Sequence, residues 1–385
     1  MRLITWVCDD RGMVRRGLVG VALLAAVTAT LSGVARGEGD WQPIELPGDL
    51  RPASLTVAGG ELWVGGRSAG ERPGMAHGSG TTWAEVPVVA ESTYARQADL
   101  VHVIVDGGHG PKAIGIATGG QHLLPRWTVW AWNGSALIEQ DQTFETFGGL
   151  SAGGLTDMAA TPGGPRILGA WSPQNRYIGT ALWSLHASTW RRDEITALAS
   201  TKMLQQLPAA MDTMGERMVI VGTTSRFEPG GNPMSQQTMW LDVGGTWAPL
   251  WPTAPTATSN GVLSDVACEP GACWAVGGAT TAPAARWQLT VYRVTADGGA
   301  VASSSEPVPD TEFNVADPAP VVAIGGGRVA VLDNHDGALW LRHLDGQWVR
   351  GNRPPGSALD AGLIGGTLYV ILERDGVRTL WSTPI

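Results

Sequence analysis

Cysteine, tyrosine, phenylalanine and charged residues are all scarce in this chain of 385 residues. The three cysteines are not needed as a framework, because a chain of this length buries a substantial core without metal or disulfide cross-links. Charged residues make up 16%, and Asp and Glu outnumber Lys and Arg by 35 to 26. Without an overall positive field to hold a polyanion, the chain is not expected to bind nucleic acid.

Glycine, proline and tryptophan are abundant by contrast. Gly 53 and Pro 25 make up about a fifth of the chain, a content that favours turns and disfavours a helical protein. Trp 18 exceeds Tyr 4 and Phe 4 together. A side chain this large is repeated where packing or stacking requires it.

The N-terminus has the pattern of an export signal. Arg15 and Arg16 precede an uncharged run from Leu18 to Leu31, and Gly33–Ala35 places small residues around a cleavage position. The alternative, a retained membrane anchor, is disfavoured because the run is shorter than the ~20 residues that a bilayer span needs.

We therefore expect a signal peptide at residues 1–35 and a mature chain of residues 36–385 that is secreted, periplasmic or held at the cell envelope. No later apolar stretch is long enough to cross a membrane. Residues 1–12 precede a second candidate start at Met13.

The mature chain repeats one unit of four short strands. Val321–Leu332 contains an apolar strand, a glycine turn and a second apolar strand, and a third strand follows at Asp336–Trp340. The turn at Asp345 and Gly346 then leads to a fourth strand, and Asp-Gly between alternating strands is a strong hairpin signal. The last unit, which runs from Ala361 to Trp381, lacks its fourth strand.

The missing strand is found at the other end of the mature chain. Gly39–Pro47 matches the fourth strands Thr82–Pro87 and Thr246–Leu250. This arrangement predicts a closed ring in which the N-terminal strand completes the last unit, and closure removes the open sheet edges.

Second-strand patterns indicate about seven units of about 50 residues each. They lie at Leu62–Gly66, Ala113–Ile116, Ile167–Ala170, Val219–Gly222, Trp274–Gly278, Val329–Val331 and Leu368–Val370. We predict an all-β fold: a single seven-bladed β-propeller of four-stranded antiparallel blades over residues 36–385. Six or eight blades are the alternatives, because the fourth strands at Ser135–Glu139 and Ala300–Ser304 are weak.

The chain resembles secreted bacterial β-propeller proteins. Trp274–Gly278, preceded by Cys268 and Cys273, resembles their repeats, and glycine doublets before a later tryptophan resemble kelch units. Asp242–Trp247 resembles the Asp-box turn of sialidase-like propellers, whereas Gly78 stands where such a turn would have its aspartate. This resemblance implies a fold and not a function.

Cys268 and Cys273 flank a short loop that would place them opposite each other across a hairpin, and an exported chain is oxidised. We predict a structural disulfide; the alternative, a metal or redox pair, lacks nearby Cys or His partners. The 7 histidines show no zinc spacing, so neither a metal site nor a cofactor is predicted. Asp333–Gly337 carries oxygen ligands but is interpreted as a turn.

Candidate ligand-binding residues lie on the loops that join second to third strands, on the propeller face where loops converge. They are Arg67, Arg72, Arg126, Arg176, Tyr177 and Arg226. Guanidinium groups from separate blades suit a carboxylate or phosphate, which favours an acidic sugar or cell-wall polymer. The alternative is that these arginines only keep exposed loops soluble.

The tryptophans divide into two groups. Trp83, Trp190, Trp247 and Trp348 follow turns at fixed places, which favours packing between blades. Trp171 and Trp251 lie near loops and are the better candidates for contact with a ligand.

No complete catalytic set is found. The four tyrosines lack the acid, base and activating glutamate that a sialidase-like hydrolase needs, and serine-nucleophile and phosphate-loop motifs are missing. We expect a secreted, non-enzymatic and monomeric binding protein whose ligand is a protein or a carbohydrate at the cell surface. The alternative is a divergent glycan-active hydrolase or lyase of the sialidase-like type that uses Arg67, Arg126, Arg176 and Tyr177.

Overall fold

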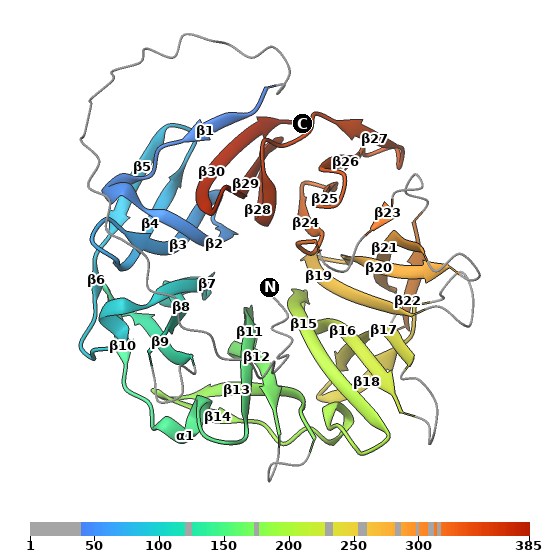
Figure 1. Ribbon diagram of the computed structural model, residues 1–385, viewed down its shortest axis with the longest axis horizontal. Helices are drawn as coiled ribbons and strands as arrows, with labels where there is room; N and C mark the ends of the chain where they lie inside the picture. Colours follow the sequence, from blue (N-terminus) through green and yellow to red (C-terminus); the bar gives the residue numbers. More distant parts are fainter. Residues whose placement is uncertain are drawn as a thin grey trace, which may run out of the picture.

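The computed structural model shows seven antiparallel sheets arranged in a ring (Figure 1). It describes residues 40–119, 125–172, 177–227, 234–252, 260–281, 286–297, 300–306, 312–313 and 317–385. The expected signal peptide at residues 1–35 lies outside these ranges. Within them, no helix is long and apolar enough to cross a membrane.

Each sheet is one blade, and its strands follow one another from the centre of the ring to the rim (Figure 1). Blade 1 contains β2 (Arg51–Ala58), β3 (Glu61–Ser68), β4 (Arg72–Ser79) and β5 (Thr82–Val86). Blade 2 contains β7 (Asp99–Val105), β8 (Pro111–Ala117), β9 (Arg126–Trp132) and β10 (Leu137–Gln140). Blade 3 contains β11 (Ala152–Thr161), β12 (Gly164–Trp171), β13 (Gly179–His186) and β14 (Thr189–Arg192).

The next three blades repeat this order. Blade 4 contains β15 (Leu204–Met214), β16 (Arg217–Arg226), β17 (Met234–Val243) and β18 (Thr246–Leu250). Blade 5 contains β19 (Gly261–Glu269), β20 (Ala272–Thr281), β21 (Arg286–Asp297) and β22 (Ala300–Ser305). Blade 6 contains β24 (Val321–Gly325), β25 (Arg328–Asp333), β26 (Ala338–Arg342) and β27 (Trp348–Gly351).

Blade 7 joins the two ends of the described chain. It contains β28 (Ser357–Ile364), β29 (Thr367–Arg374), β30 (Val377–Pro384) and, as its outermost strand, β1 (Gln42–Ile44). Pro43 lies opposite Trp381 in this pairing, and Trp41 donates its indole N–H to the carbonyl of Asn352 at 3.1 Å. The predicted seven-bladed propeller, closed by its N-terminal strand, is thus confirmed.

Short elements occupy the connections. β6 (Val88–Val89) pairs in parallel with β10, and β23 (Glu312–Phe313) pairs with β21. The helix α1 (Phe144–Phe147) and 3-10 turns at Pro47–Asp49, Ala95–Gln97, Gly107–His109 and Thr196–Leu198 complete the elements.

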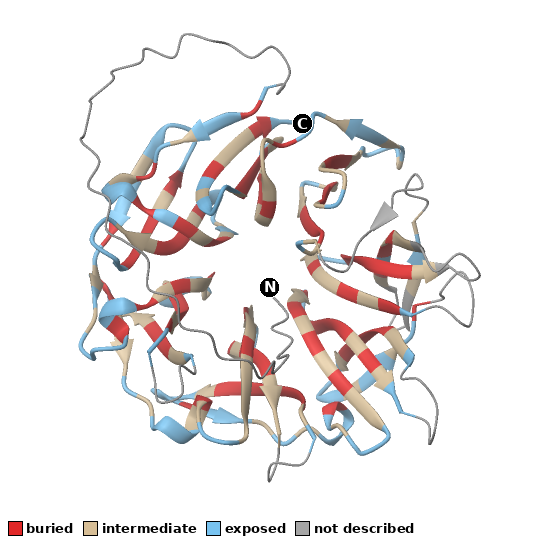
Figure 2. Ribbon diagram, in the orientation of Figure 1, coloured by how far each residue is buried: buried red, intermediate tan, exposed pale blue. Residues whose placement is uncertain are grey.

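The core lies between neighbouring blades, because the buried clusters combine residues from the strands of adjacent sheets. Figure 2 shows buried residues along the strands of every blade. The third strands of blades 2, 3 and 4 each bury one tryptophan completely: Trp130, Trp183 and Trp240. Trp190 is also buried, whereas Trp83, Trp247 and Trp348 are half-buried, each packed against a hydrophobic cluster. Large aromatic side chains therefore serve packing in this fold.

The innermost strands carry β-bulges that require glycine opposite them. In six of the seven blades the pairing between first and second strands shifts register. A Cβ atom on Gly222 would lie 2.1 Å from the carbonyl oxygen of Leu207, and one on Gly277 would lie 2.0 Å from that of Val262. The glycines that end several second-strand patterns therefore admit the bulged backbone of the neighbouring strand.

Side chains also tie the blades together around the centre. Four aspartates on innermost strands each accept a backbone N–H from the innermost strand of the next blade: Asp157 from Met211, Asp212 from Cys268, Asp265 from Val322, and Asp360 from Leu55, all at 2.7 to 2.8 Å.

The other three junctions use different groups. Ser54 donates to the carbonyl of Leu100, His102 lies 3.5 Å from Asp157, and the Asn334 amide bonds both the N–H and the carbonyl of Ala358. A side-chain contact to an innermost strand thus joins each of the seven junctions, and at blades 6 and 7 it comes from Asn334 in the β25–β26 turn.

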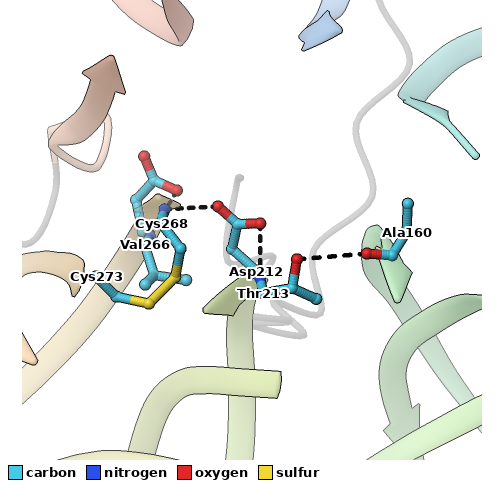
Figure 3. The surroundings of a disulfide bond; sticks show 7 residues. Ala160, Asp212, Thr213, Val266, Cys268 and Cys273 are labelled. Carbon is cyan, nitrogen blue, oxygen red and sulfur yellow. Dashed lines mark hydrogen bonds between the residues drawn. A yellow bond between two sulfur atoms is a disulfide. The ribbon is translucent and has the colours of Figure 1, made fainter. Parts of the chain in front are cut away.

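The predicted disulfide between Cys268 and Cys273 is present. The two residues lie opposite each other on β19 and β20, beside the turn at Pro270 and Gly271. Figure 3 shows that the bond lies next to Asp212, whose carboxylate accepts the Cys268 N–H.

Candidate functional site

One face of the ring carries the longer connections. Each blade is a meander, so the loops between second and third strands leave the sheet on the same side as the connections between blades. We call this side the loop face. The opposite side carries tight turns such as that at Gly244 and Gly245, where Asp242 accepts the N–H of Gly245 at 2.8 Å.

Exposed aromatic side chains gather on the loop face of blades 2 to 4 and on its connections. They are Tyr94, Phe144, Tyr177, Phe227 and Trp251, which are between 38% and 52% exposed. Because such rings are usually buried, a group of them on one face indicates a surface for contact with a ligand or partner.

A pocket of about 480 Å³ opens on this face between blades 3 and 4. Its lining comes from the β12–β13 connection, the segment before β15, the start of β15 and the end of β16: Ser172, Tyr177, Ile178, Thr201, Lys202, Gln205 and Phe227. The rings of Tyr177 and Phe227 supply apolar surface, and hydroxyl, amide and ammonium groups supply hydrogen bonds. The lining within the described ranges contains no carboxylate.

Backbone hydrogen bonds fix the wall of this pocket. Thr201 and Leu204 pair across a tight turn that carries Lys202, with Thr201 N–H donating to the Leu204 carbonyl at 2.7 Å. Phe227 donates its N–H to the carbonyl of Met203 at 3.1 Å, which joins the end of β16 to the same turn. Phe227 and Lys202 are therefore held on one hydrogen-bonded support.

Arg126 lies over two aromatic rings at the start of β9. Its guanidinium carbon is 4.6 Å from the centre of the Phe144 ring and 5.6 Å from that of Tyr94. The rings come from the connections on either side of blade 2, so three segments meet at this arginine. Glu139 supports one of them by accepting the N–H and hydroxyl of Ser92 near Tyr94.

Arg226 has a similar environment at the end of β16. Its guanidinium carbon lies 5.7 Å from the centre of the Trp251 ring. Trp251 is 42% exposed, whereas Trp171 is half-buried beneath Arg192 and contacts Trp183 edge-on. Of these two tryptophans near loops, Trp251 is the more accessible.

The remaining predicted site residues differ from these two arginines. Arg67 forms an ion pair with Glu71 at 2.9 Å and donates to the carbonyl of Gln97 at 2.8 Å. The side-chain hydrogen bond from Arg51 to Glu71 lowers the pKa of Glu71, as do the charges of both arginines. Arg72 is exposed at the first position of β4, and Arg176 lies outside the described residues.

The structure therefore brings Tyr177 into the pocket and places Arg226 next to one of its lining residues in the chain. No described contact joins two of the predicted arginines. Sequence reasoning missed Thr201, Lys202 and Gln205, because it weighed arginines on loops within blades and not the connections between blades. It also missed the rings around Arg126, whose proximity depends on the packing of separate loops.

A separate group of titratable side chains surrounds the centre of the ring. Burial raises the pKa of the linking aspartates, to about 8 for Asp157 and Asp265, about 7 for Asp360 and about 6 for Asp212, although backbone N–H bonds oppose this rise. Neighbouring carboxylates add to it for Asp157, Asp265 and Asp360. Burial lowers the pKa of His102 to about 4.

Within the described ranges, no group of three or more His, Cys, Asp or Glu side chains is placed to hold a metal ion. The aspartates at the centre instead accept two backbone N–H groups each, one from the following residue and one from the next blade. They are part of the framework of the ring.

Comparison with known proteins gives the fold. No family model matches the chain, and no curated protein matches it. Among solved structures, Kuenenia stuttgartiensis hydrazine synthase superposes with a TM-score of 0.53 at 12% identity, over 90% of this chain and 98% of that one. A puromycin-hydrolyzing peptidase of Mycobacterium tuberculosis gives 0.53 at 14% identity, over 90% of this chain and 54% of that one. These likenesses concern the propeller alone.

Proposed function

We propose that the chain is a non-enzymatic binding protein that holds a carbohydrate on its loop face. The observation that carries this proposal is the pocket between blades 3 and 4, where two exposed rings accompany hydroxyl, amide and ammonium groups. The C–H faces of a sugar stack on aromatic rings, while its hydroxyls require hydrogen-bond donors and acceptors close by.

Binding without turnover fits this lining better than hydrolysis does. Glycoside hydrolysis generally uses two carboxyl groups about 5 to 10 Å apart, one on each side of the bond to be cleaved. Tyr177 and Lys202 are the titratable groups among the described lining residues, and neither has a carboxylate neighbour there. The export pattern of the N-terminus supports a binding event at the cell surface or in the envelope.

The test is a glycan array probed with the mature chain, residues 36–385. We expect a saturable signal, and Tyr177→Ala and Phe227→Ala should each weaken it by about tenfold, because stacking on an aromatic ring contributes about 1 kcal/mol beyond the area that it buries. Product release is monitored in parallel, since turnover would favour a hydrolase or lyase.

Leu344→Ala is the matched control, because Leu344 is 71% exposed in the β26–β27 turn on the opposite face. This variant should bind as the wild type does. An array without any saturable signal, or a signal that both ring deletions leave unchanged, would show that the pocket is not a carbohydrate site.

A further inference from the structure

We propose that the bound carbohydrate is acidic and that Arg126 and Arg226 recognise its anionic groups. This inference rests on the carbohydrate binding proposed above and adds the charge of the ligand and the residues that recognise it.

Several cations elsewhere in the ring already have acidic partners. Arg166 pairs with Asp193 at 2.8 Å, Arg378 with Asp99 at 3.0 Å and Arg342 with Glu306 at 3.4 Å. Arg67, which the sequence grouped with Arg126 and Arg226, is occupied by Glu71. An arginine in such a pair has little left to offer a ligand, since its charge and several of its N–H donors are used.

Arg126 and Arg226 are held in a different way. Among the described residues neither has a carboxylate partner, and their contacts are with the rings of Tyr94, Phe144 and Trp251. A cation over a ring is restrained without giving up its N–H donors to an acceptor. The planar guanidinium group of each arginine therefore stays available for two parallel hydrogen bonds to a carboxylate or sulfate.

Both arginines lie on the loop face, Arg226 next to the pocket and Arg126 on blade 2, which adjoins blade 3 of the pocket wall. Arg226 precedes Phe227 in the chain, and Phe227 lines the pocket. Arg126 lies over Phe144 of α1, in the connection between blades 2 and 3. Lys202 adds a third cation within the lining itself. Aromatic surface beside cations that have no carboxylate partner among the described residues matches a sugar chain that carries acidic groups.

Local charge is decisive here because the whole chain repels anions. Its net charge is -9, so long-range attraction does not bring an acidic glycan to the surface. Selectivity for the acidic form must come from short-range contacts with these cations, and the affinity should fall as salt screens them.

The experiment compares matched oligosaccharides by calorimetry at low and high salt. The probes are tetrasaccharides of galacturonate, mannuronate and hyaluronan, their carboxyl-reduced neutral counterparts, and a sulfated galactose tetramer. The variants are Arg126→Gln and Arg226→Gln, with Arg67→Gln as the matched control, and thermal unfolding verifies that each is folded. Arg126→Lys keeps the charge but replaces the planar fork.

We expect at least one acidic tetrasaccharide to bind about tenfold or more tightly than its reduced counterpart at low salt, since hydrogen bonds to charged groups are the strong ones. Arg126→Gln and Arg226→Gln should each remove most of that preference, Arg126→Lys should keep part of it, and Arg67→Gln should leave it unchanged. The sulfated tetramer distinguishes recognition of sulfate from recognition of carboxylate.

Equal binding of the acidic and neutral forms would overturn this inference and leave the carbohydrate site standing. Loss of preference in Arg67→Gln equal to that in Arg126→Gln would also overturn it. If no oligosaccharide of either kind binds, the proposed function fails together with the inference, and binding of a polyglutamate peptide instead would assign the arginines to a protein ligand.

Discussion

The second-strand glycines show how a single residue supports the repeat. Gly66, Gly222 and Gly277 each lie where a bulged innermost strand brings a carbonyl oxygen within about 2 Å of a Cβ position. The sequence displays these glycines as part of a repeated pattern. The reason why these positions require glycine is visible only in the structure, because no characteristic residue marks the bulges in this sequence.

Gly222→Ala tests this interpretation. The added Cβ would meet the Leu207 carbonyl at 2.1 Å, so the backbone of β15 or β16 must shift, and we expect a loss of about 2 kcal/mol or more in the free energy of unfolding. Urea titration measures it. Gly108→Ala is the control, since a Cβ there has no atom within 4 Å, and equal stability of the two variants would contradict the steric account.

The side chains that contact each arginine were the least predictable part of the candidate site. Arg67 and Arg126 look alike in the sequence, yet the first is held by Glu71 and the second lies over Phe144. The difference arises because Glu71 is on the same hairpin as Arg67, whereas Phe144 comes from the next connection. Only the packing of loops against each other decides such partners.

Strands were predicted well because each repeat is encoded locally. Hairpin turns and alternating apolar residues lie close together in the chain, and seven blades and the closing strand followed from them. The short strand β6 was not predicted, since two residues carry no periodicity. The aspartates of the innermost strands were also missed, because aspartate is disfavoured in strands and its role depends on the adjacent blade.

Removal of the strand β1 tests whether this strand closes the ring. A chain that begins at Pro47 lacks this strand and Trp41, which is only 5% exposed, and leaves β30 as an open edge. We expect a loss of about 3 to 5 kcal/mol, the usual effect of deleting a buried tryptophan, together with association through the edge. Thermal unfolding and size-exclusion chromatography measure the two effects.

A chain that begins at Asp40 retains β1 and is the control for this truncation. It should behave as the mature chain does. A monomeric and equally stable chain from Pro47 would mean that β1 contributes nothing to the ring.

The molecule as a whole is a ring of seven wedges joined at the centre by side chains. Four of the seven junctions depend on aspartates whose pKa values lie above the ordinary value near 4. Because the carboxylates face one another and His102 is neutral above about pH 4, their charges are poorly compensated. The stability of the ring should therefore depend on pH.

The sign follows from linkage. A carboxyl with a higher pKa in the folded protein stabilises the fold fully below its unfolded pKa near 4, and this contribution is lost as the pH rises through the folded values of about 6 to 8. We expect the melting temperature to fall as the pH is raised from 5 to 9. Asp265→Asn, which carries no charge at any of these pH values, should show a smaller fall.

Asp375→Asn is the control for this pH profile, because Asp375 is 93% exposed and its positive φ of 52° is tolerated by asparagine. Its profile should match that of the wild type. A melting temperature that is flat or rises between pH 5 and 9 would show that the central aspartates do not govern stability.

The pairing of β1 with β30 also affects the order in which the blades can fold during synthesis. β1 and β30 are the first and last strands of the described chain, and Asn352, which accepts the Trp41 indole N–H, lies 311 residues after Trp41. Blades 1 to 6 can form from local hairpins as the chain grows, whereas blade 7 is completed only when Val377–Pro384 have emerged. We therefore expect ring closure to be the last and slowest step of folding, because it must bring the most distant segments together.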